Sequence, residues 1–144
     1  MIIGVDFDGT IVEDKYPEIG RERPFATDTL RMLIADRHRL ILWTVREGRE
    51  LDEAVQWCRE RGVEFYAINR DFPEENVSKN RSYSRKIKAD VWIDDRNVGG
   101  LPDWGTIYRI INEKKSYEDV MREAMVGGLD DHKPPRKKHW WSRG

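Results

Sequence analysis

The sequence has a single cysteine, Cys58, among its 144 residues. One cysteine excludes an internal disulfide and a cysteine-based zinc cluster, because each needs at least two. The chain also lacks an apolar stretch near the roughly 20 residues that a membrane-spanning helix requires, and it starts without a basic leader or a signal-like cleavage site. We therefore expect a cytoplasmic protein with no membrane partner.

The chain also lacks an excess of either positive or negative charge. The 26 basic and 27 acidic residues leave a formal net charge of −1, so the chain as a whole has no attraction for nucleic acid or an anionic membrane. Most of the charges are expected on solvated helix faces. At this length we expect one domain with a single core over residues 1–126, followed by a tail over residues 127–144.

Short apolar runs alternate with segments of helical period, which predicts an α/β protein with a parallel sheet and helices on its faces. Strands are expected at residues 2–7, 40–43, 63–68, 89–93 and 106–111. Helices are expected from Pro24, over residues 48–61 with Gly62 as the stop, and from Ser116 with Asp119 in a capping box. The helical spacing predicts that Cys58 is a core residue and that the last helix buries Tyr117, Val120, Met121 and Ala124.

Two carboxylates follow the first apolar run. Asp6 and Asp8 stand where this strand opens into a turn at Gly9. Residues i and i+2 of an extended chain point the same way, so both carboxylates can reach one small volume, which is costly without a cation or a shared proton. Mg²⁺ takes oxygen ligands and keeps positions for a substrate phosphate, and an aspartate beside it can attack phosphorus. The plainer alternative is that both residues are turn formers.

Polar residues also end two later strands. Thr44 follows the second apolar run, and Asp94 and Asp95 follow the fourth. Because ligands of open α/β sheets bind outside the carboxyl ends of the strands, Asp6, Thr44 and Asp94 are expected to converge on one crevice. Taken alone, Thr44 is better explained by the preference of β-branched residues for strands. Arg46, just past it, is expected on the surface at the rim.

These stretches together resemble the motifs of the haloacid dehalogenase-like (HAD) superfamily: D-x-D-x-T at residues 6–10, an apolar run ending in Thr44, Lys86, and an apolar run ending in Asp94-Asp95. The resemblance covers roughly residues 1–112. It implies a Rossmann-like three-layer α/β/α sandwich with a mainly parallel sheet of order 5-4-1-2-3. No cap domain fits in the short insertions of this chain, so the resemblance points to the minimal capless type.

The resemblance implies a Mg²⁺-dependent phosphatase that hydrolyses phosphomonoesters through an aspartyl phosphate. Asp6 would be the nucleophile and Asp8 the general acid and base. Thr44 and Lys86 would bind the transferring phosphoryl group, and Lys79, in the same basic cluster, is the alternative to Lys86. The metal ligands would be Asp6, Asp8 through its backbone carbonyl, Asp94 and Asp95. Alternatively, Asp95 would contact the other ligands without binding the metal directly, or would pair with Arg96.

The sequence leaves the substrate open, and nucleic acid enters only as a substrate with a phosphorylated end. Two other functions remain: a phosphoaccepting signalling module such as a receiver domain, and an inactive phosphate-binding protein on the same scaffold. Asp8 argues against the first, because a slow phosphoacceptor needs no acid two residues past its nucleophile. The basic segment 133–144, with Trp140 and Trp141, is either a solvated tail or a segment that docks on this domain, on another subunit of a homo-oligomer or on a base.

Overall fold

The computed structural model describes residues 1–70 and 88–129. The chain divides into two compact units, Met1–Tyr108 and Arg109–Gly144. Lys79, Lys86 and the segment 133–144 lie outside the described residues, so the expectations for them stay predictions. Within the part of the chain that is described, no helix combines the length and apolar character needed to cross a bilayer.

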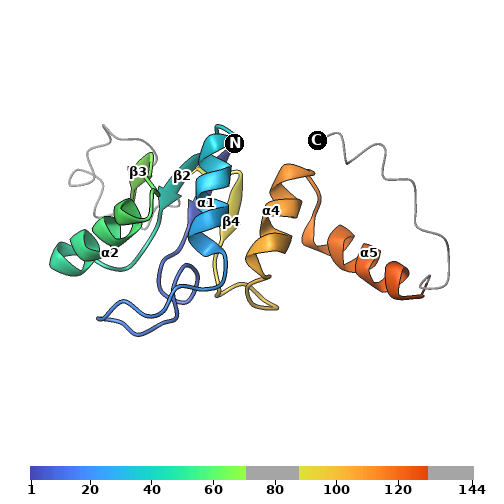
Figure 1. The fold of residues 1–144 in the computed structure, drawn as a ribbon, viewed down its shortest axis with the longest axis horizontal. Helices are drawn as coiled ribbons and strands as arrows, with labels where there is room; N and C mark the ends of the chain where they lie inside the picture. Colours follow the sequence, from blue (N-terminus) through green and yellow to red (C-terminus); the bar gives the residue numbers. More distant parts are fainter. Residues whose placement is uncertain (71–87, 130–144) are drawn as a thin grey trace. The chain divides into compact units, whose positions relative to one another are not determined.

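The first unit is built on a parallel sheet, which confirms the expected α/β class. Its described strands are β1 (Ile2–Val5), β2 (Arg39–Leu42), β3 (Ala67–Ile68) and β4 (Val91–Ile93). They lie in the order β3-β2-β1-β4, so β1 is flanked on both sides (Figure 1). All pairings are parallel, and therefore the carboxyl ends of the four strands share one edge.

Two helices of the first unit follow the predicted pattern. Helix α1 (Ala26–Ala35) buries Ala26, Leu30 and Leu33, and it packs against β2. Helix α2 (Gly48–Glu60) buries Ala54 and Cys58, and Gly62 follows it with a φ of 79°. Burial raises the pKa of the Cys58 thiol to about 12. Cys58 is thus a core residue, as predicted, and a buried thiol with a raised pKa is a poor nucleophile.

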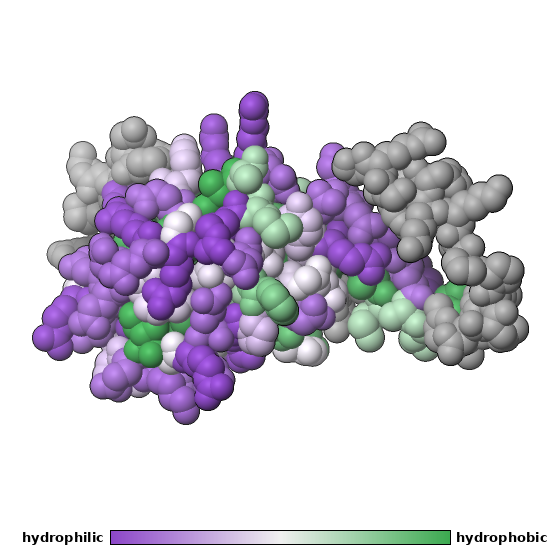
Figure 2. Space-filling view, in the orientation of Figure 1, coloured by the Kyte–Doolittle hydropathy of each residue, from purple (hydrophilic) through white to green (hydrophobic). Residues whose placement is uncertain are grey.

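The exposed faces of these helices carry charges. Arg31 pairs with Asp28 on α1, and Arg49 pairs with Glu53 on α2, with all four side chains well exposed. Figure 2 shows that hydrophilic residues cover most of the visible face of this unit. Exposed pairs of this kind contribute little to stability, about 0–1 kcal/mol each. These four charges lie on solvated helix faces, as expected.

The expected fifth strand at residues 106–111 is wrong, because this segment belongs to helix α4 (Trp104–Asn112). Asp103 begins the helix by accepting hydrogen bonds from the amide and the hydroxyl of Thr106, at 2.9 and 2.7 Å. Trp104, Ile107 and Ile111 are buried at the i, i+3, i+7 spacing of a helix. The buried residues follow the spacing of a helix and not the alternation of a strand.

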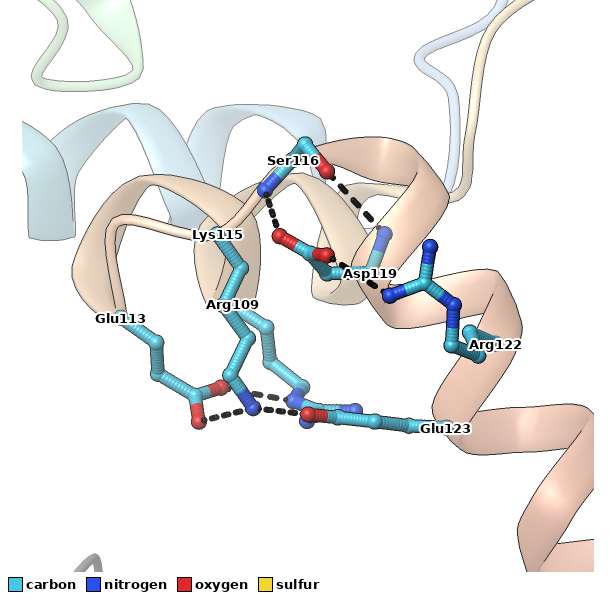
Figure 3. Close-up of polar contacts among 7 residues, drawn as sticks. All are labelled: Arg109, Glu113, Lys115, Ser116, Asp119, Arg122 and Glu123. Atoms are coloured by element: carbon cyan, nitrogen blue, oxygen red, sulfur yellow. Dashed lines mark hydrogen bonds and ion pairs between the residues drawn. The ribbon is translucent and has the colours of Figure 1, made fainter.

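Helix α5 (Tyr117–Leu129) lies in the second unit and starts with the predicted capping box. Ser116 Oγ accepts a hydrogen bond from the Asp119 amide, and Asp119 Oδ2 accepts one from the Ser116 amide, both at 3.1 Å (Figure 3). Val120 is buried as predicted.

Two other residues of α5 were expected in the core and are exposed, Met121 and Ala124. On the same helix, Glu123 pairs with Arg109 at 3.1 Å and also with Lys115, which lies 3.3 Å from Glu113 (Figure 3). Because Glu123 forms these ion pairs, part of the surface of α5 is charged, and its apolar face is narrow. The predicted face was therefore too wide.

Candidate functional site

Three carboxylates meet at the carboxyl edge of the sheet. Asp6 directly follows β1, and its amide donates to the carbonyl of Ile93 at 3.0 Å, which extends the pairing between β1 and β4. This pairing brings Asp6 beside the two acids that end β4. Asp6, Asp94 and Asp95 each offer a ligand atom, and these atoms lie within 4.8 Å of one another. Hard oxygen donors at this spacing suit a divalent cation such as Mg²⁺.

Thr10 connects two of these acids. Its hydroxyl is fully buried and lies 3.0 Å from Asp95 Oδ1 and 3.4 Å from Asp6 Oδ2. The same hydroxyl oxygen accepts a hydrogen bond from the Asp95 amide at 3.0 Å. Trp104 stabilises the loop that carries Thr10, since its indole N–H donates to the carbonyl of Thr10 at 3.2 Å. Trp104 had no signal in the sequence that tied it to the site.

The acidic cluster has an electrostatic cost. Burial, followed by the charges of Asp94 and Asp95, raises the pKa of Asp6 to about 7, although a backbone hydrogen bond at Phe7 opposes the shift. Burial also opposes ionisation of Asp95, but hydrogen bonds from Thr10 and Asp6 hold its pKa below the usual value. Below about pH 7 the cluster therefore tends to keep a proton on Asp6 when no cation is bound.

Gly9 lets the loop pass close to this cluster. Its φ is 86°, and its amide donates to the carbonyl of Val12 at 2.8 Å. A Cβ added to Gly9 would lie 2.4 Å from Asp95 Oδ2, well inside contact distance. Only glycine combines this backbone conformation with this approach.

We expect Gly9→Ala to lower the free energy of unfolding by about 2–4 kcal/mol and to weaken metal binding, because Asp95 must move. Gly48→Ala is the matched control, since Gly48 has a φ of 58° and open space around its missing Cβ. The control should show the backbone strain alone, about 1 kcal/mol. Urea denaturation of both variants measures the difference, and equal losses would show that Asp95 moves aside at no cost.

Thr44 lies at the same edge, just after β2. Its amide donates to Asn69 Oδ1 at 2.8 Å, and its hydroxyl oxygen accepts a hydrogen bond from the Arg46 amide at 3.1 Å. The hydroxyl proton of Thr44 remains able to donate to a ligand. Sequence reasoning missed Asn69, and the only signal for it was a polar residue directly after the third strand.

Asp8 lies in a different environment from the three clustered acids. Its two carboxylate oxygens each bind the guanidinium of Arg46, with Nε and Nη2 at 2.7 Å. The side chain of Asp8 is 11% exposed, and that of Arg46 is 0% exposed. The expectation that Arg46 lies on the surface is therefore wrong. Carbonyl groups from a distant segment surround this arginine, so its local sequence could not show the burial.

The fold and the site together define an α/β protein with a carboxylate cluster at the carboxyl edge of a parallel sheet. No protein-family model and no curated protein matches the chain. Among solved structures, the chain is similar to a conserved protein from Bacteroides thetaiotaomicron, with 62% identity, a TM-score of 0.76, and coverage of 83% of this chain and 96% of that one. The chain belongs to the same family as this Bacteroides protein.

Proposed function

We propose that the protein is a Mg²⁺-dependent phosphatase of the HAD type, with a capless Rossmann-like domain. The observation that carries the proposal is the meeting of Asp6, Asp94 and Asp95 within 4.8 Å. Such a cluster is costly without a cation, as the raised pKa of Asp6 indicates. The motif order along the sequence supports the same family, and the parallel sheet is compatible with its fold.

In this proposal, Asp6 is both the nucleophile and a metal ligand. One of its oxygens attacks phosphorus in line with the leaving oxygen, which forms an aspartyl phosphate and breaks the bond to the leaving group. Mg²⁺, held by Asp6, Asp94 and Asp95, would supply positive charge against the phosphoryl oxygens. Asp95 would help to hold the Asp6 carboxylate in one orientation, because the Thr10 hydroxyl lies within hydrogen-bond distance of both residues.

Asp8 is the proposed acid and base of the two steps. Its protonated form gives a proton to the leaving oxygen, and its carboxylate then takes a proton from the water that hydrolyses the aspartyl phosphate. The water oxygen ends on the released phosphate, and Asp6 and Asp8 return to their starting states. The hydroxyl of Thr44 donates a hydrogen bond to the transferring group, and Lys86 remains the proposed charged contact.

Hydrolysis of 4-nitrophenyl phosphate should require added Mg²⁺ and should cease in excess chelator. The physical reason is that three carboxylates without a cation repel both one another and the phosphate dianion. Activity should return when Mg²⁺ is restored, and Asp52→Asn, a change at an exposed position of α2, should leave it unchanged. Equal turnover with and without metal would contradict the proposal. A screen of nucleotides, sugar phosphates and oligonucleotides with terminal phosphates would then identify the substrate class.

A further inference from the structure

Arg46 uses all of its hydrogen-bond donors. Nε donates to Asp8 Oδ2, and Nη2 donates to Asp8 Oδ1 and to the carbonyl of Glu18 at 2.8 Å. Nη1 donates to the carbonyls of Pro17 and Glu50, at 3.1 and 3.3 Å. A guanidinium has five N–H donors, and these five contacts account for all of them. A buried charged group needs such partners, because burial without hydrogen bonds is costly.

Aromatic rings complete this environment. The guanidinium carbon of Arg46 lies 5.2 Å from the ring centre of Phe7 and 5.1 Å from that of Tyr16. The hydrogen bond to Asp8 raises the pKa of Arg46, so the buried group is a permanent cation. A lysine has three donors on a single nitrogen and cannot reproduce this planar set of contacts.

The contacts of Arg46 join two separate segments of the chain. Asp8 belongs to the loop after β1, whereas Pro17 and Glu18 belong to residues 12–23, a segment that we call the flap. Backbone bonds from Glu13 to Arg21 and from Arg23 to Ile11, both 2.8 Å, pair the two sides of the flap. Arg46 therefore holds the turn of the flap and the Asp8 carboxylate in one fixed arrangement.

We propose that Arg46 is a positioning residue that holds Asp8 in the orientation needed for proton transfer, with the flap turn as the second support. This inference rests on the proposed function, because it assigns Arg46 to the acid and base step. Each oxygen of Asp8 has one bond to Arg46 and keeps a second lone pair. These free lone pairs leave the carboxylate able to contact a leaving oxygen or a water while Arg46 holds it.

Two substrates that differ in their leaving group distinguish a positioning role of Arg46 from a merely structural one. A 4-nitrophenolate leaves without a proton, whereas the oxygen of an alkyl phosphate needs one. The value of kcat/KM reports the first phosphoryl transfer, so later hydrolysis of the intermediate does not mask the effect. Arg46→Lys should lose about 10- to 100-fold more kcat/KM on an alkyl phosphate than on 4-nitrophenyl phosphate. The reason is that a misplaced acid slows only the alkyl phosphate, whose leaving oxygen needs a proton.

Arg61→Lys is the matched control. Arg61 also lies over an aromatic ring, that of Trp57 at 3.7 Å, and donates to the carbonyl of Trp57, but its side chain is 36% exposed and it does not bind Asp8 in the structure. Both substrates should keep the same kcat/KM in this variant. Equal losses on both substrates in Arg46→Lys would show a structural role and would overturn the inference.

A second variant keeps the inference testable if Arg46→Lys does not fold. The double variant Asp8→Asn with Arg46→Met removes both charges of the buried pair, which is often tolerated. If Arg46 acts through Asp8, this double variant should be no less active than Asp8→Asn alone. A further loss of ten-fold or more would overturn the inference. A wild-type protein without metal-dependent hydrolysis would instead overturn the proposed function, and the role of Arg46 with it.

Discussion

Asp6→Asn is expected to abolish metal-dependent hydrolysis and, at the same time, to stabilise the metal-free protein. The loss of activity follows because the amide can neither attack phosphorus nor serve as an anionic ligand. The gain in stability follows because, above about pH 7, the wild-type protein has to bury an ionised Asp6 beside Asp94 and Asp95. A functional carboxylate that costs stability is a common compromise at active sites.

The sign of the pH dependence follows from the raised pKa. The pKa of Asp6 is about 7 in the folded protein, against a usual value of 3.8. The folded state therefore holds the proton more tightly, and this stabilisation is complete below pH 3.8 and lost as the pH rises to about 7 and above. Asparagine cannot ionise, so the advantage of Asp6→Asn should be larger at pH 8 than at pH 5. We expect about 2–3 kcal/mol at pH 8, after allowance for solvent screening.

Urea denaturation in chelator, at pH 5 and pH 8, measures this advantage. Saturating Mg²⁺ should then stabilise the wild-type protein, by about 2.7 kcal/mol at a concentration 100 times the Kd, and should have little effect on Asp6→Asn. Asp52→Asn serves again as the control, because Asp52 is exposed on α2 and should show neither effect. An Asp6→Asn protein that is less stable than wild type at pH 8 in chelator would show that the cluster is not under electrostatic strain.

Arg46→Ala is expected to lower the free energy of unfolding by about 3–5 kcal/mol, the usual cost of removing one partner of a buried ion pair. The change leaves the Asp8 carboxylate, at 11% exposure, without its cation. It also removes the donors to the carbonyls of Pro17 and Glu18. For a domain of this size, such a loss is a large part of the total stability.

Arg61→Ala provides the comparison, because the ion pairs of Arg61 are long, 3.9 Å to Glu22 and 4.0 Å to Glu60. Its loss should be about 1 kcal/mol, mainly from the contact with Trp57. Both values come from urea denaturation of the metal-free proteins and need no enzymatic assay. A cost for Arg46→Ala as small as that of the control would mean that water or another group replaces the guanidinium.

The meeting of Asp6, Asp94 and Asp95 could be anticipated because it depends on simple rules. Apolar runs of strand length predicted β1 and β4, and parallel strands bring their carboxyl ends to one edge. The acids that follow such runs then have to meet there. Cys58 and the capping box of Ser116 and Asp119 were also predictable, because helical spacing and caps are local features.

For Asp8, the prediction from strand alternation did not hold. The expectation that Asp6 and Asp8 point the same way holds for an extended chain. β1 ends at Val5, and the backbone turns at Gly9 with a φ of 86°. Once the chain leaves the extended conformation, the alternation no longer fixes the direction of a side chain. The nearest buried cation then determined where the Asp8 carboxylate lies.

The sequence by itself determined the parallel sheet and the acids at its edge, since strand patterns and strand ends are encoded by neighbouring residues. Only the tertiary structure decided that Arg46 is buried and that residues 106–111 form part of α4. Arg46 follows a strand in a polar segment, and the carbonyls that enclose it come mainly from the flap, nearly thirty residues earlier. Contacts between distant segments have no local signature, because their free energy arises only when the chain has brought both partners together.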